Sequence, residues 1–194
     1  MNDGLSEIFE TIDDNGLSIT NTPPTIGDVR EKWLATKKRK IMEPMKKTAE
    51  VLNDLIKINN DRIAGYEKAI AELPAADVDL KALFSGLIEQ SQMLKDELQQ
   101  HISAWEDRVD DETTAAGKIY RAWMDVKQTF AVDDRKAILE SCEYGEDAAQ
   151  KAYRQAEEVA EISTAAKALI SSQKTQLLAS HDQIKQLRDR EKAM

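Results

Sequence analysis

The chain has 194 residues, of which 41% are hydrophobic and only 5% aromatic, and it carries a formal net charge of −9. This length allows one sizeable core and excludes none of the common one-domain architectures, whereas the shortage of aromatic residues, glycine and proline excludes most sheet proteins. We therefore predict an all-α protein. The single cysteine, Cys142, cannot form an internal disulfide and is expected to be a small buried residue in a cytoplasmic protein.

The negative charge is distributed unevenly along the chain. Residues 1–47 contain eight basic and eight acidic side chains, so the whole net charge of −9 falls on residues 48–194. Such a surface repels nucleic acid and anionic lipid. No apolar run approaches the roughly 20 residues that span a bilayer. We expect neither nucleic-acid nor membrane binding. The basic run 37–40 is the one exception to the acidic character of the chain. A homo-oligomer or a complex with a protein partner is compatible with these charges.

The first 46 residues lack sustained periodicity and are interrupted by three glycines and a Pro-Pro pair. We interpret residues 1–46 as a flexible N-terminal arm with two short helices, one over residues 5–12 and one over residues 28–40. The second would begin at a capping Asp28, with Glu31 three positions later. A bundle domain is expected over residues 47–194.

Four long amphipathic helices follow the arm. Apolar residues recur at three- and four-residue intervals over residues 48–73, 79–105, 133–159 and 164–190. Short links join the first two helices and the last two, whereas residues 107–133 form a long connection with a short helix of its own. Two antiparallel hairpins joined by one long crossover are the connectivity of ferritin-like four-helix bundles.

Each apolar stripe contains polar exceptions, and most of them lie near the midpoint of their helix, where antiparallel hairpins share a level. These residues are Asn59, Arg62, Ser91, Glu146, Gln173 and His181. A carboxylate in a core needs a partner, and a guanidinium can supply bidentate hydrogen bonds, so we expect Arg62 to pair with Glu146. His181 would cap this network. We thus predict a polar core layer of Asn59, Arg62, Glu146 and His181, which either fixes helix register or forms a pocket.

A metal site is the alternative interpretation of the polar residues. Ferritin-like carboxylate proteins use Glu-x-x-His pairs, and the chain contains none. The weak metal candidates are Glu146 with His181, and Glu97 with His101, which are four residues apart instead of three. We predict no catalytic residue and expect no cofactor, although a single adventitious ion at Glu146 and His181 remains an alternative.

Five segments resemble a bacterial family of uncharacterised proteins with a ferritin-like four-helix-bundle domain of unknown function. They are VLNDLIKINNDRIAGYEKA at 51–69, LFSGLIEQSQMLKDEL at 83–98, GKIYRAWMDVKQ at 117–128, DRKAILESCEYGEDAAQKAYRQA at 134–156 and SHDQIKQLRD at 180–189. The resemblance spans residues 48–190 and implies the bundle fold together with a general link to stress physiology. It implies no activity, substrate or cofactor, and residues 1–46 depart from it.

Two hypotheses follow for the function. The first is a non-enzymatic binding or stress-associated module, which could associate with itself through an exposed helix face. The second is a ferritin-like protein that binds a metal ion or a small ligand in the polar core layer.

Overall fold

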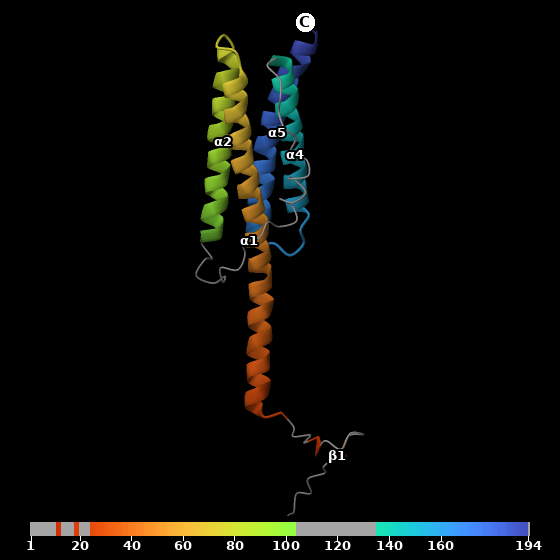
Figure 1. Ribbon diagram of the computed structural model, residues 1–194. Coiled ribbons are helices and arrows are strands. Elements are labelled where there is room, and N and C mark those ends of the chain that lie inside the picture. The colour runs from red at the N-terminus through yellow and green to blue at the C-terminus, as the bar shows by residue number, and fades with distance from the viewer. Residues whose placement is uncertain (1–10, 13–17, 20–23, 104–134, 194) are drawn as a thin grey trace, which may run out of the picture. The chain divides into compact units, whose positions relative to one another are not determined.

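The computed structural model describes residues 11–12, 18–19, 24–103 and 135–193 (Figure 1). Its elements are β1 (Thr11–Ile12), β2 (Ser18–Ile19), α1 (Ile26–Glu72), α2 (Val78–Ser103), α4 (Arg135–Glu157) and α5 (Thr164–Ala193). The prediction of an all-α four-helix bundle is confirmed. The chain divides into two compact units, residues 1–40 and residues 41–194, and the boundary falls within α1.

The first unit contains the short strands and the beginning of α1. β1 and β2 pair antiparallel, with Thr11 opposite Ile19 and Ile12 opposite Ser18. A helix was expected over residues 5–12, but its last two residues belong to β1, and the rest of that range lies outside the described residues.

α1 begins two residues earlier than predicted, because Thr25 caps it in place of Asp28. The Thr25 hydroxyl accepts a hydrogen bond from the Asp28 N–H at 3.2 Å, and the Asp28 carboxylate accepts one from the Thr25 N–H at 2.9 Å. This reciprocal pair is a capping box in which aspartate takes the third position. The expected cap at Asp28 with Glu31 is therefore wrong by one turn.

α1 also runs through Pro44, so the predicted helix over residues 28–40 and the one starting at residue 48 are a single element. A proline inside a helix removes one backbone hydrogen bond and costs about 3 kcal/mol. Here the missing hydrogen bond would have been accepted by the carbonyl of Lys40. Because Lys40 is exposed, water can solvate this carbonyl instead. The Thr48 hydroxyl donates to the Pro44 carbonyl at 2.7 Å.

Within the second unit, two helical hairpins form the bundle. One hairpin turns between α1 and α2 and the other between α4 and α5 (Figure 1). The start of α4 lies beside the start of α2, because the Arg135 guanidinium donates to Asp77 and Asp79 at 2.7 to 3.1 Å. At the other end of the bundle, the Ser163 N–H donates to the Thr48 hydroxyl at 3.1 Å.

These contacts fix the directions of the helices. α2 and α4 run the same way along the bundle, so Ser103 and Arg135, which flank residues 104–134, lie at opposite ends of it. The predicted pair of antiparallel hairpins joined by a long crossover is consistent with this arrangement. The short helix expected within residues 107–133 lies outside the described residues.

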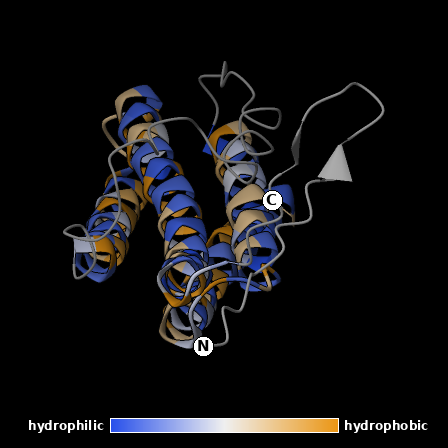
Figure 2. Cartoon of the chain, turned by 90° about the horizontal axis from the view of Figure 1, so that it is seen from below, coloured by the Kyte–Doolittle hydropathy of each residue, from blue (hydrophilic) through white to orange (hydrophobic). Residues whose placement is uncertain are grey.

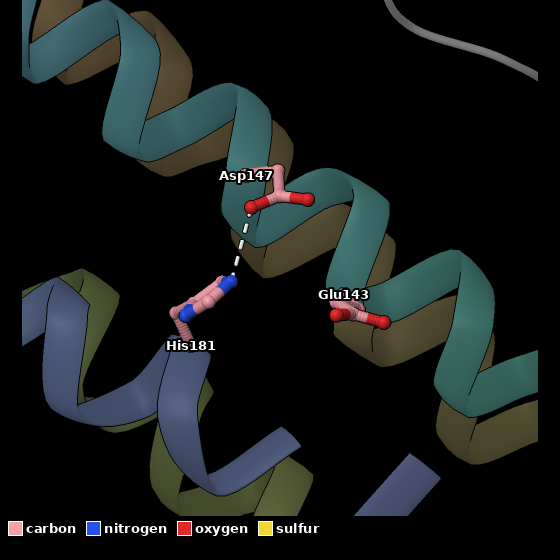
Figure 3. A group of neighbouring side chains, drawn as sticks. All are labelled: Glu143, Asp147 and His181. Carbon is pink, nitrogen blue, oxygen red and sulfur yellow. Dashed lines mark ion pairs between the residues drawn. The ribbon is translucent and has the colours of Figure 1, made fainter. Parts of the chain in front are cut away.

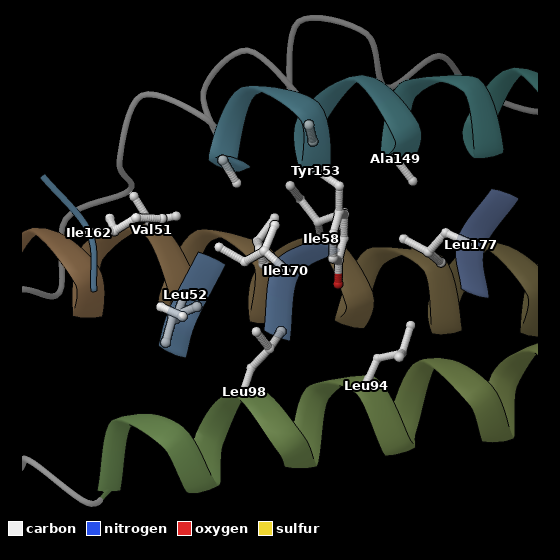
Figure 4. Close-up of a cluster of buried hydrophobic side chains, with 14 residues drawn as sticks. Val51, Leu52, Ile58, Leu94, Leu98, Ala149, Tyr153, Ile162, Ile170 and Leu177 are labelled. Atoms are coloured by element: carbon white, nitrogen blue, oxygen red, sulfur yellow. The ribbon is translucent and has the colours of Figure 1, made fainter. Parts of the chain in front are cut away.

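Two apolar clusters fill the bundle. One contains Leu52, Leu55, Leu98, Tyr153 and Ile170 among its fully buried members, and side chains from all four helices converge in it (Figure 4). The other is built around Phe84, Leu139 and Ile184 near the α1–α2 turn. Each helix carries hydrophobic and hydrophilic residues side by side, as amphipathic helices do (Figure 2). Along α1, α2 and α4, the buried residues between the clusters are polar, and most of them belong to the candidate site.

Candidate functional site

An ion pair lies between the two apolar clusters. Arg62 on α1 donates from Nη2 and Nε to Oε1 of Glu146 on α4, at 2.7 and 3.2 Å. The two side chains are only 2% and 1% exposed. A buried carboxylate without a cation would be prohibitive, so each of these charges makes the other tolerable. The structure thus contains the predicted pairing of Arg62 with Glu146.

Tyr66 completes the shell around the same carboxylate oxygen. Its hydroxyl donates to Glu146 Oε1 at 2.5 Å. Burial, and after it the negative charge of Glu146, raises the pKa of Tyr66 well above its ordinary value. Burial by itself would lower the pKa of Arg62, but the Glu146 charge and the neighbouring tyrosines outweigh it and raise that pKa. Arg62 therefore stays protonated and Tyr66 stays neutral, which makes both permanent donors.

The network continues from Arg62 to the other helices. Arg62 Nη1 donates to the Ser91 hydroxyl on α2 at 2.8 Å, and that hydroxyl donates in turn to the Leu87 carbonyl at 2.7 Å. Nη1 also lies 3.5 Å from Oδ1 of Asn59. One guanidinium thus joins three helices of the bundle.

A second branch reaches α5 through Tyr153. Asn59 Nδ2 donates to the Tyr153 hydroxyl at 2.8 Å, and that hydroxyl donates to Gln173 Oε1 at 3.0 Å. The Gln173 amide then donates to the Leu94 carbonyl and to Glu97. We call the connected residues the core network: Asn59, Arg62, Tyr66, Ser91, Glu97, Glu146, Tyr153 and Gln173.

The core network uses almost all of its own hydrogen-bonding capacity. Among the described residues, only Oε2 of Glu146 within it is buried without a hydrogen-bond partner. Most of its donors bond to acceptors on neighbouring helices, and these bonds fix the register of the helices. Few hydrogen-bonding groups are left to bind a ligand. The chemistry of the layer is therefore that of a permanently charged hydrogen-bond network.

His181, which was expected to cap this layer, lies elsewhere. Its Nε2 is 3.0 Å from Oδ1 of Asp147, and its Nδ1 is 3.0 Å from Oδ1 of Asp182. Gln173 is the α5 residue that reaches the core network, and His181 follows it by eight residues, or about 12 Å along the helix. His181 contacts Asp147, the residue next to Glu146, so it lies at the level of the Arg62–Glu146 pair, but it sits on a different side of α5 from Gln173 and makes its contacts at the α4–α5 surface instead of in the core network.

His181 belongs to a different group, which lies between α4 and α5. Glu143 and Asp147 stand one turn apart on α4 and face His181 across the helix pair (Figure 3). One ligand atom from each lies within 4.8 Å of the others. Of the described residues, this is the one group of three or more His, Cys, Asp or Glu side chains close enough to hold a metal ion. It contains one of the four weak metal candidates, His181.

The other weak candidates are placed differently. Glu146 is occupied by Arg62 and Tyr66, and Glu97 accepts a hydrogen bond from Gln173 Nε2 at 2.9 Å. His101 lies near the end of α2, where partial burial lowers its pKa. Cys142 is buried, and burial raises the pKa of its thiol, which keeps it in the unreactive protonated form.

The first part of α1, residues 26–40, is a second candidate surface, since every residue in it is exposed. With 3.6 residues per turn, one side of this helix carries apolar residues and three basic residues, and the other side carries Asp28 and Glu31 with Lys32, Lys38 and Arg39. We call the first side the apolar–basic face: Ile26, Val29, Arg30, Trp33, Leu34, Lys37 and Lys40. The Lys37 ammonium lies 4.8 Å from the centre of the Trp33 ring, as in a cation–π contact.

Comparison with known proteins identifies the family. A family model described as a domain of unknown function (DUF2383) matches residues 47–159. The chain belongs to this family. No curated protein and no solved structure matches the chain. The DUF2383 match takes in Arg62, Ser91 and Glu146 and ends before α5, which supplies Gln173 and His181.

Sequence reasoning missed several residues of these sites. Tyr66 and Tyr153 were not among the predicted residues of the polar core layer, yet both side chains are buried and their hydroxyls therefore need partners. The spacing of Tyr66, four residues after Arg62, could have indicated its role. Among the described residues, no helix combines the length and apolarity that a membrane crossing requires.

Proposed function

We propose that this chain is a non-enzymatic binding protein that associates with a second copy of itself through the apolar–basic face of α1. The observation that carries the proposal is the sorting of side chains on residues 26–40. Four large apolar groups share one side of the helix with Arg30, Lys37 and Lys40. Both acidic groups lie on the other side, together with Lys32, Lys38 and Arg39. A partner for this face has to be both acidic and partly apolar.

Exposure of the face supports the need for a partner. Ile26 is 90% exposed and Trp33 is 58% exposed, and Val29 and Leu34 are also exposed. Helices in proteins gain most of their stability from packing an apolar side, and an isolated helix of about 15 residues is marginal in water. Burial of this face against another surface would supply the missing stabilisation.

Charge supports a second copy as that partner. Residues 48–194 carry the whole net charge of −9. The apolar–basic face holds three of the basic side chains of the N-terminal region, Arg30, Lys37 and Lys40. Attraction between this face and the bundle of another copy follows from these charges, and it should weaken as salt screens them, with a Debye length of about 10 Å at 0.1 M.

The bundle itself supports the rest of the proposal. The shared direction of α2 and α4 and the sequence resemblance favour a ferritin-like bundle, and that resemblance also favours a bacterial protein with a role in stress physiology. The core network argues against the alternative of a ligand site in the polar layer, because Oε2 of Glu146 is its one buried side-chain atom without a hydrogen-bond partner among the described residues. A deletion strain that survives heat, oxidant and osmotic stress as well as its parent would contradict the stress role.

Sedimentation equilibrium of the full chain tests the self-association. We expect a concentration-dependent dimer or larger oligomer in low salt, and a shift towards monomer in high salt. Lys37→Glu, on the apolar–basic face, should weaken association at least about tenfold, because it places a like charge against the acidic bundle.

Lys38→Glu is the matched control. It makes the same change in net charge one residue away, about 100° around the helix on the side that carries Glu31, outside the apolar–basic face. It should leave the association constant close to that of the unmodified chain. A chain that stays monomeric at all concentrations, or equal effects of the two substitutions, would refute the proposal.

A further inference from the structure

The α4–α5 surface brings together three side chains that no known role explains. Glu143 and Asp147 project from successive turns of α4, and His181 points towards them from α5 (Figure 3). One ligand atom from each lies within 4.8 Å of the others. Glu143 is buried and His181 largely so, with 12% of its side chain exposed, whereas Asp147 is exposed. The group is therefore anchored on one side and open to solvent on the other.

The surroundings of the imidazole match those of a metal ligand. In metal sites, a ligating histidine almost always donates its other ring N–H to a carboxylate or carbonyl, which fixes the tautomer. Asp182 Oδ1 lies 3.0 Å from Nδ1 of His181 and can accept that proton. Nε2 faces Asp147, whose Oδ1 lies 3.0 Å away, and a metal ion bound there would take the place of a proton between these two atoms.

From this geometry we propose that Glu143, Asp147 and His181 bind one divalent transition-metal ion, with Zn²⁺ as the best fit. Two carboxylate oxygens and one imidazole nitrogen are a ligand set that suits zinc, and solvent can complete a tetrahedron. Ligand atoms at about 2.1 Å from zinc are about 3.4 Å apart in a tetrahedron. His181 Nε2 and Asp147 Oδ1 are already 3.0 Å apart. The longer separations, all within 4.8 Å, therefore involve Glu143, and metal binding needs a small movement of that side chain.

Charge around the group also favours a cation. Arg188 pairs with Oε2 of Glu143, which holds that carboxylate in place. Asp189 pairs with the same guanidinium at 2.8 Å and offsets its charge. With a neutral His181, the carboxylates of this region outnumber its one guanidinium, so a divalent ion enters an acidic environment. The site shares no residue with the apolar–basic face, so failure of the metal proposal would leave the proposed function untouched.

Titration calorimetry with Zn²⁺ on the metal-free full chain tests the proposal. We expect one saturable site per chain. His181→Gln should abolish it, since it removes the only nitrogen ligand, and Asp182→Asn should weaken it by about 10- to 100-fold, because Asp182 acts only through the orientation of the ring. Co²⁺ in place of zinc should give the visible absorption of a four- or five-coordinate ion.

His101→Gln is the control, because His101 is the other histidine of the chain and lies on α2. It should bind zinc as the unmodified protein does. Circular dichroism of the metal-free variants verifies that each one is folded. Absence of saturable binding, equal zinc affinity in His181→Gln, or an equal loss in His101→Gln would overturn the proposal and leave His181 as an ion-paired histidine between two aspartates.

Discussion

Glu146→Gln is the substitution whose effect follows most directly from the core network. It removes the negative charge that two nitrogens of Arg62 contact, in a place where both side chains are almost fully buried. Arginine does not deprotonate in proteins, so its charge stays in the core without compensation. Breaking a buried pair in this way costs about 3–5 kcal/mol of the free energy of unfolding. For a domain of this size, that corresponds to a fall in melting temperature of about 6–20 °C.

Urea denaturation followed by circular dichroism measures this loss, and a double-mutant cycle identifies its cause. Arg62→Met combined with Glu146→Gln removes both charges of the buried pair. If the unpaired guanidinium dominates, the double variant should be more stable than Glu146→Gln alone, although it carries one more substitution. A loss below about 1 kcal/mol for Glu146→Gln, or a double variant as unstable as the sum of the singles, would refute this reasoning.

Three further predictions concern other parts of the bundle. Tyr153→Phe removes the hydroxyl between Asn59 and Gln173 and should lower the free energy of unfolding by about 1–3 kcal/mol, measured by urea denaturation. The hydrogen bond from Arg135 lowers the pKa of Asp79 to about 2. The ionised carboxylate therefore stabilises the fold fully above its ordinary pKa of 3.8, and this stabilisation is lost as the pH falls towards 2. Asp79→Asn should make the free energy of unfolding differ less between pH 5 and pH 2. The Cys142 thiol should react slowly with a thiol reagent in the native protein and rapidly in urea, because burial raises its pKa, and equally fast reaction in both would contradict its placement.

The bundle could be predicted from the sequence because each helix carries its own periodic signal. The stripes over residues 48–73 and 164–190 place their apolar positions inward, and the structure follows them within a few residues at most ends. The pairing of Arg62 with Glu146 was also within reach, since two opposite charges on inward stripes near helix midpoints have few other partners. These inferences rest on spacing along single helices.

The misses depend on how helices pack against one another. Periodicity does not say which helices are neighbours. The hydrogen bonds that join Asn59, Tyr153 and Gln173 could therefore not be predicted from it. The place of His181 beside Asp147 depends on the same information. The continuity of α1 through Pro44 was missed because a proline usually ends a helix, and here an exposed position makes its cost tolerable.

Hydrogen–deuterium exchange at two protein concentrations is the most direct test of the claim that this chain works by binding through α1. At low concentration, the amides of residues 26–40 should exchange rapidly, because nothing buries them. At a concentration above the dissociation constant of self-association, their exchange should slow while that of the core residues of α2 stays unchanged. Identical exchange of residues 26–40 at both concentrations would contradict the account.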